Sequence, residues 1–254
     1  MSAFEIVAIL LAGVAAGSLN AIVGSGTLVT FPTLLAFGVP SVTANVSNTV
    51  GLVPGTLSGA LAYRAELTGQ RPRLLRLGVA SLLGGILGAV LLLWLPSAAF
   101  DAVVPVLVGL GVLLVAVGPA VQKRVAARHE RTGGLPEEGA RWVWPSVAAV
   151  GVYGGYFGAA QGVLLMAIMG IGVPDDLQRL NATKNVLALL VNGVAAVVFI
   201  AVAHVDWAAA GLIAIGSVVG GQLGARVGRR LPAAVLRGVI VVVGSVAVVA
   251  LVAR

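Results

Sequence analysis

The chain contains no cysteine and few charged side chains. Asp, Glu, Lys and Arg make up 10% of its 254 residues, and Phe, Trp and Tyr make up only 5%. The absence of cysteine excludes disulfides and cysteine metal ligands. A soluble domain carries about a quarter charged residues, so the scarcity of charge argues against an ordinary soluble fold. Hydrophobic residues make up 59% of the chain and the mean hydropathy is +1.07, which is typical of a polytopic membrane protein.

The net charge of +7 would suit a nucleic-acid-binding protein, but the positions of the charges argue against it. Thirteen of the sixteen Lys and Arg residues lie in three short stretches, 64–76, 123–141 and 226–237. Short basic loops between apolar segments are typical of the cytoplasmic side of a membrane protein. We therefore expect a lipid bilayer around the chain, no nucleic-acid partner, and a cytoplasmic position for all three stretches.

Apolar segments long enough to cross a bilayer predict an all-α fold with eight full helices. These lie near 4–23, 43–63, 74–95, 99–121, 142–161, 180–203, 207–227 and 233–253. Two shorter apolar segments, 27–37 and 163–172, follow breaks rich in small residues at Gly24–Thr27 and Gly158–Gly162. They predict half-helices or re-entrant segments, and the sequence leaves open whether they cross the membrane or turn back.

The two halves of the chain resemble each other. Gly24 aligns with Gly158, the tripeptide 38–40 with 172–174 (both Gly-Val-Pro), and Asn45 with Asn181. If the three basic stretches are cytoplasmic, corresponding helices run in opposite directions, as in the inverted repeats of many secondary transporters. We therefore expect a first repeat over 1–122, a basic cytoplasmic linker over 123–141, and a second repeat over 142–254.

Each half carries one polar stripe on an otherwise apolar helix. Residues at positions 0, 3, 4 and 11 share one side of a helix. In the first half these are Asn45, Asn48, Thr49 and Thr56, and in the second they are Asn181, Lys184, Asn185 and Asn192. Such a stripe must face protein or a water-filled cavity.

Two interpretations of the stripes stay open. They could form hydrogen bonds that only hold helices together, as in a membrane scaffold or subunit that transports nothing. They could instead form a substrate site, which we prefer because the stripes match and each follows a segment broken by glycine.

An anion is the substrate that these residues favour. Broken helices expose backbone N–H groups at the positive ends of helix dipoles, and Asn, Ser and Thr add neutral donors. Lys184 adds one formal positive charge, unless it extends to a membrane interface instead. The predicted substrate-binding residues are Asn20, Gly24, Ser25, Gly26, Thr27, Asn45, Ser47, Asn48, Thr49, Gln161, Asn181, Thr183, Lys184 and Asn185.

No sequence pattern indicates catalysis. The chain has no HExxH motif, no phosphate-binding loop and no paired carboxylates, so we predict no enzyme activity, no cofactor and no metal site. No Asp or Glu lies in the middle of a predicted span, which leaves the coupling ion open. A homo-oligomer also stays open.

The glycine-rich breaks resemble those of the TauE/SafE family of sulfite and organosulfonate exporters. In the first half the stretch reads GSLNAIVGSGTLVTFPTLLAFGVP and is followed by ANVSNT; in the second it reads GVYGGYFGAAQGVLLMAIMGIGVP and is followed by NATKN. The second half departs from the pattern with Met166 where the first has Pro32. The resemblance implies a bacterial inner-membrane permease for a small sulfur-containing anion.

Overall fold

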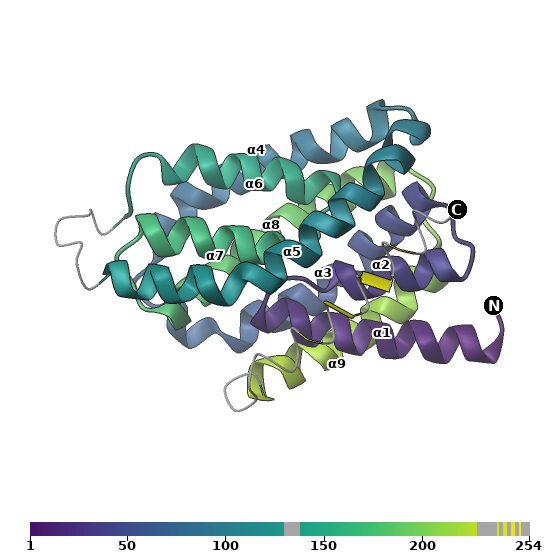
Figure 1. The fold of residues 1–254 in the computed structure, drawn as a ribbon, viewed down its shortest axis with the longest axis horizontal. Coiled ribbons are helices and arrows are strands. Elements are labelled where there is room, and N and C mark those ends of the chain that lie inside the picture. Colours follow the sequence, from purple (N-terminus) through teal and green to yellow (C-terminus); the bar gives the residue numbers. More distant parts are fainter. Residues whose placement is uncertain (130–137, 228–237, 239–240, 243–244, 247–248, 250–254) are drawn as a thin grey trace.

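The computed structural model describes residues 1–129 and 138–227, and the isolated positions 238, 241, 242, 245, 246 and 249. In this part of the chain all regular elements are helices and there is no strand (Figure 1). They are α1 (Ala3–Ile22), α2 (Thr27–Ala36), α3 (Ser41–Ala62), the short 3-10 helix η1 (Arg64–Leu67), α4 (Arg71–Trp94), α5 (Ser97–His129), α6 (Val143–Tyr156), α7 (Gln161–Gly172), α8 (Leu177–Val202) and α9 (Trp207–Val227).

The prediction of a polytopic helical protein is confirmed, but the count of eight full spans is not. Five of the described helices, α1, α4, α5, α8 and α9, are long and apolar enough to cross a membrane. The helix predicted over 142–161 is shorter, because it ends at Tyr156 and the backbone turns at Gly158 with φ of 77°. The helix predicted over 99–121 continues to His129. The predicted helix over 233–253 lies outside the continuously described residues.

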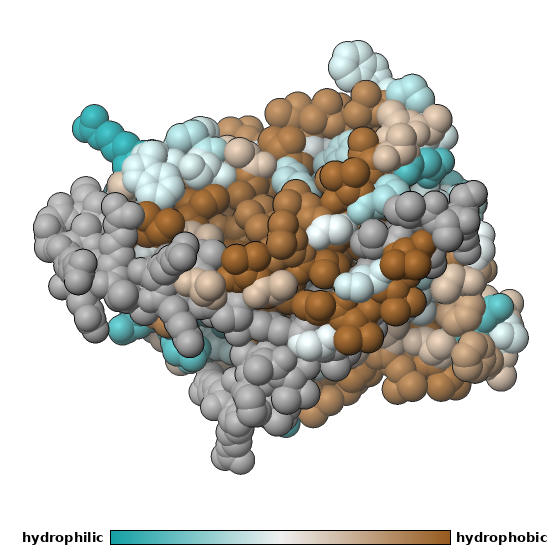
Figure 2. Space-filling view, in the orientation of Figure 1, coloured by the Kyte–Doolittle hydropathy of each residue, from teal (hydrophilic) through white to brown (hydrophobic). Residues whose placement is uncertain are grey.

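The outside of the bundle is apolar where a bilayer would touch it. Helix α4 exposes Leu75, Val79, Leu83, Ile86 and Val90, and their spacing of three or four residues places them on one side of the helix. Figure 2 shows apolar residues spread over the middle of one face, with hydrophilic residues toward its two ends. So large an exposed apolar surface is expected of a protein that contacts lipid.

The short helices turn back beside the helices that precede them. The rings of Phe4, in the first turn of α1, and Phe37, at the end of α2, have centroids 6.1 Å apart. In the second half the Ala140 N–H, just before α6, donates to the carbonyl of Gly172, the last residue of α7, at 2.7 Å. Helices α1 and α2, and likewise α6 and α7, therefore form re-entrant hairpins, which resolves the alternative that the sequence left open.

The two hairpins enter the bundle from opposite ends. The chain begins at one end of the long axis in Figure 1, and the thin trace of the linker lies at the other end, where α6 begins. We call these the N-terminal end and the linker end.

Element boundaries recur at a nearly constant interval. Helix α2 begins at Thr27 and α7 at Gln161, which is 134 residues later. Helix α4 begins at Arg71 and α9 at Trp207, which is 136 residues later. The two-residue difference lies in the turn before α8, where the sequence alignment also requires an insertion.

Glycines let helices of different halves pack backbone against backbone. Helix α4 packs on α6, and α9 packs on α1. A Cβ added to Gly84 would lie 2.2 Å from the Ala148 carbonyl oxygen, and one added to Gly220 would lie 2.0 Å from that of Val14. These two contacts are related by the same offsets as the helices. Such close approach is the usual basis of helix association in lipid.

Replacement of Gly220 by alanine should destabilise the protein, because no space exists for a methyl group between α9 and α1. Overpacking costs about 1–3 kcal/mol, so the midpoint of thermal unfolding in detergent should fall. Gly211→Ala is the matched control on the same helix, since an added Cβ there meets nothing within 4 Å. Equal unfolding midpoints for the two variants would contradict this packing.

Candidate functional site

The tips of the two hairpins touch at the centre of the bundle. The Gly162 N–H donates to the Gly24 carbonyl at 3.0 Å. A Cβ on Gly24 would lie 2.4 Å from the Gly162 Cα, and the φ of Gly24 is +79°. Glycine is thus required at 24 both for the turn and for the contact.

A small cavity lies where the tips meet. It is lined by Asn20, Gly24, Thr27, Thr56, Gly158, Gln161, Gly162, Asn185, Ala188 and Asn192. Both halves contribute to this central cavity, and none of its lining side chains carries a formal charge. Its volume of about 20 Å³ is room for about one water molecule, so it is closed to anything larger in this structure.

Two helix N-termini begin at the central cavity. Thr27 and Gln161, the first residues of α2 and α7, both line it. The Gly26 N–H donates to Asn20 Oδ1 at 2.7 Å. The positive end of a helix dipole, equivalent to about half an elementary charge, therefore lies on each side of the cavity.

Gln161 presents a hydrogen-bond donor with no partner within the described chain. Its side chain is 3% exposed, and its Nε2 atom is buried without a hydrogen bond. Gly154 makes room for this amide, because a Cβ there would lie 2.5 Å from the Gln161 Cδ. A buried amide without a partner is unfavourable, and a ligand in the cavity would supply the missing acceptor.

The polar stripes satisfy the carbonyls that the broken helices expose. Asn45 Nδ2 donates to the carbonyl of Tyr156, the last residue of α6, at 2.9 Å. Asn181 and Asn185 donate to the Ala21 carbonyl near the end of α1, at 3.3 and 3.4 Å. The last carbonyls of a helix have no partner within it, so each stripe caps the broken helix of the other half.

Lys184 belongs to the same cap. Its Nζ donates to the carbonyls of Asn20 and Ala21 at 3.2 and 3.5 Å, and the residue is 0% exposed. The interpretation that Lys184 extends to a membrane interface is therefore wrong. A positive charge at a helix C-terminus is favourable, and the ammonium group lies behind the cavity wall rather than in it.

The remaining predicted residues lie around the cavity or at the ends of the bundle. Asn48 Nδ2 donates to Thr27 Oγ1 at 3.3 Å, and Thr49 donates to the Asn45 carbonyl at 2.9 Å. Ser25 is buried and its Oγ has no partner in the described residues. Ser47 and Thr183 lie farther out, where Ser47 Oγ accepts from the Asp206 N–H and Thr183 donates to Gln70, both at 2.8 Å.

The list of predicted residues omitted two that line the cavity, Thr56 and Asn192. Both lie at the eleventh position of a stripe, two turns of helix beyond Thr49 and Asn185. Helical spacing had placed them on the polar side, and that signal could have identified them. Among the described residues, no group of three His, Cys, Asp or Glu could hold a metal ion.

Comparison with known proteins identifies the family. The family model described as "Sulfite exporter TauE/SafE" matches residues 9–251. The chain belongs to the TauE/SafE family. It is 26% identical over 242 residues to "Probable membrane transporter protein YfcA" of Escherichia coli strain K12, which covers 91% of this chain and 83% of that protein. It is also 26% identical over 249 residues to "Probable membrane transporter protein ORF9" of Sinorhizobium sp, covering 95% and 90%.

No solved structure matches the chain. The family and these relatives are membrane transporters rather than enzymes. Membership of the family, together with the apolar helices, makes this TauE/SafE chain a multi-pass membrane transporter.

Lys184→Met should weaken the fold as well as the site. A hydrogen bond to a charged group is worth about 1.5–3 kcal/mol, and this variant loses the bonds to the α1 carbonyls. We expect a lower unfolding midpoint and an anion affinity on the order of ten- to a hundredfold weaker, by binding titration. Asn48→Ala should lose less, nearer 1 kcal/mol. Wild-type affinity and stability of Lys184→Met would contradict both roles.

Proposed function

We propose that the protein is a secondary transporter of a small anion, which binds in the central cavity. One observation carries this proposal: a polar cavity lies where two broken helices meet, and a buried amide of Gln161 has no partner there. Ligand sites at the midplane, between discontinuous helices of two repeats, are characteristic of secondary transporters.

The electrostatics of the cavity favour a monoanion. The N-termini of α2 and α7 together supply roughly one positive charge, and the C-termini of α1 and α6 supply a similar negative charge that the stripes cap. Lys184 then adds one formal charge, so the balance near the cavity is about one positive charge. A single negative charge is matched by this environment, whereas a dianion leaves one charge without compensation in a medium of low dielectric constant.

Hydrogen sulfite or an organosulfonate is the substrate that agrees with both the site and the family. The family description names sulfite export, and a sulfonate group offers three acceptor oxygens to amide and hydroxyl donors. The cavity of about 20 Å³ must widen to admit such a group. We place the protein in the bacterial cytoplasmic membrane, with the linker end on the cytoplasmic side.

An inverted repeat accounts for how the cavity would widen. The matching offsets of the helices, the equivalent glycine contacts and the opposed hairpins support two halves, 1–122 and 142–254, joined by the linker 123–141. In such folds the repeats exchange conformations and open the site to each side in turn.

A second candidate function, a membrane scaffold that transports nothing, also has an observation in its favour. Asn45, Asn181, Lys184 and Asn185 are all engaged in capping helix ends, which a purely structural role would require. This candidate offers no reason for the polar lining of the central cavity, where Thr56, Asn192 and Gln161 converge.

Anion flux in proteoliposomes separates the two functions. We expect uptake of methanesulfonate, a monoanion, and little or no uptake of sulfate, a dianion of similar shape. Gln161→Leu should weaken methanesulfonate affinity on the order of ten- to a hundredfold, because a hydrogen bond to a charged group is worth about 1.5–3 kcal/mol. Gln178→Leu, at an exposed position, is the matched control. No flux of sulfite, sulfonates or sulfate through folded protein would support the scaffold.

Single cysteines test the orientation, because the native chain has none. Thr68→Cys at the linker end should react with a membrane-impermeant reagent only in broken cells. Ser97→Cys at the N-terminal end should react in intact cells, since both positions are exposed. The reverse pattern would refute the cytoplasmic placement of the basic stretches.

A further inference from the structure

Two arginines converge on one carboxylate at the linker end. Arg73 on α4 forms an ion pair with Asp175, which lies in the turn between α7 and α8. Arg179 Nε donates to the second oxygen of Asp175 at 2.7 Å. The side chains of Arg73 and Asp175 are only 9% and 11% exposed. Guanidinium groups fit carboxylates and other oxyanions because their donors form a planar fork.

Further hydrogen bonds join these groups to the ends of α4 and α8. Gln70 Oε1 accepts from Arg73 Nη1 and from Thr183 Oγ1, both at 2.8 Å. Arg179 Nη1 also donates to the Thr68 carbonyl at 3.2 Å. We call Gln70, Arg73, Asp175, Arg179 and Thr183 the Asp175 cluster.

The carboxylate of the Asp175 cluster is ionised at neutral pH. Burial by itself would raise the pKa of Asp175, but hydrogen bonds from Arg73, the Asp176 amide and Arg179, together with the Arg73 charge, hold it below its ordinary value. The two arginines are therefore occupied by an anion that belongs to the chain itself.

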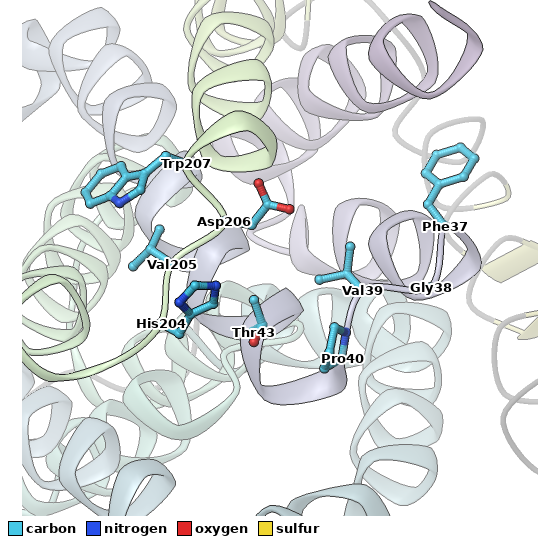
Figure 3. A pocket seen from close by; sticks show the side chains of 9 residues that line it. All are labelled: Phe37, Gly38, Val39, Pro40, Thr43, His204, Val205, Asp206 and Trp207. Atoms are coloured by element: carbon cyan, nitrogen blue, oxygen red, sulfur yellow. The ribbon is translucent and has the colours of Figure 1, made fainter. Parts of the chain in front are cut away.

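The N-terminal end has an open pocket at the corresponding place. This pocket has a volume of about 500 Å³ and is lined by Phe37, Gly38, Val39, Pro40, Thr43, His204, Val205, Asp206 and Trp207. We call it the Trp207 pocket. Figure 3 shows residues 37–40 and 204–207 on opposite sides of it, with Thr43 between them.

The Trp207 pocket and the Asp175 cluster occupy equivalent positions in the two halves. Gly38-Val39-Pro40 corresponds to Gly172-Val173-Pro174, and Asp206, which lies 136 residues after Gln70, corresponds to that residue. The bond between Asp206 and Ser47 then corresponds to the one between Gln70 and Thr183.

One substitution between the halves accounts for the different filling. Arg179 takes the place of Thr43. The short Thr43 leaves the Trp207 pocket open, whereas Arg179 extends across the equivalent space to the Thr68 carbonyl.

We propose that Arg73 and Arg179 form an anion-binding site at the linker end, which Asp175 occupies here and a small oxyanion occupies once Asp175 moves away. Asp175 lies in a turn outside both flanking helices, so it can leave without unwinding either one. Its departure would open a pocket equivalent to the Trp207 pocket, with two guanidinium groups in its wall. The proposal rests on the proposed function only in taking this oxyanion to be the transported one.

Cysteine labelling at two equivalent valines tests this site. Val39 lines the Trp207 pocket, and its counterpart Val173 is 0% exposed. In purified protein, Val39→Cys should react with a charged thiol reagent, and Val173→Cys should react slowly. Adding Asp175→Asn should speed the labelling of Val173→Cys at least tenfold. Methanesulfonate at millimolar concentration should then slow that labelling, and Arg73→Gln should remove this protection.

The adjacent carboxylate provides the matched control. Asp176 is exposed, so Asp176→Asn makes the same change of charge and should leave the labelling of Val173→Cys unchanged. An unchanged rate for Val39→Cys in the Asp175→Asn background shows that the variant is folded. Equal effects of Asp175→Asn and Asp176→Asn, or faster labelling without protection by methanesulfonate, would overturn the proposal. Absence of flux in proteoliposomes would contradict the transport function alone, since labelling does not depend on flux.

Discussion

The need to satisfy the backbone of broken helices governs this structure. Water is absent from the middle of a bilayer, so an exposed carbonyl there must find a donor within the protein. Helices α1 and α6 both end near the centre of the bundle, and each ends against the polar stripe of the opposite half. The capping bonds hold the hairpin tips in contact, and the contact defines the central cavity. Without the stripes, neither hairpin could end where it does.

The same bonds separate two roles that one sequence pattern combines. Asn45, Asn181 and Lys184 act on the helix C-termini, which carry negative partial charge. Thr27, Gln161 and Asn192 lie at the cavity, close to the helix N-termini. A broken helix pair thus creates one set of groups to be capped and another set that can bind an anion. The charge of Lys184 contributes to both, because it neutralises a helix end and lies close behind the cavity wall.

The close glycine contacts leave little freedom at the centre, and the two ends of the bundle differ. Backbone contacts between Gly24 and Gly162, and between α4 and α6, allow no side chain to be inserted. At the ends, by contrast, the same backbone arrangement holds an ion-paired cluster on one side and an open pocket on the other. A fold with a tightly packed centre and two unequal ends suits a transporter whose changes in access take place at its surfaces.

The sequence alone determined the class of fold, the positions of the helices and the family, because apolar length, basic stretches and glycine-broken segments are local features. It also placed Asn45, Lys184 and their neighbours on polar stripes, since helical spacing is local. Only the tertiary structure decided that the short segments turn back, that Lys184 caps α1, and that Thr56 and Asn192 line the cavity. These depend on which groups meet across the two halves, over more than a hundred residues of chain. The pairing of Arg73 with Asp175 has the same origin, because a salt bridge between distant helices leaves no periodic trace in either one.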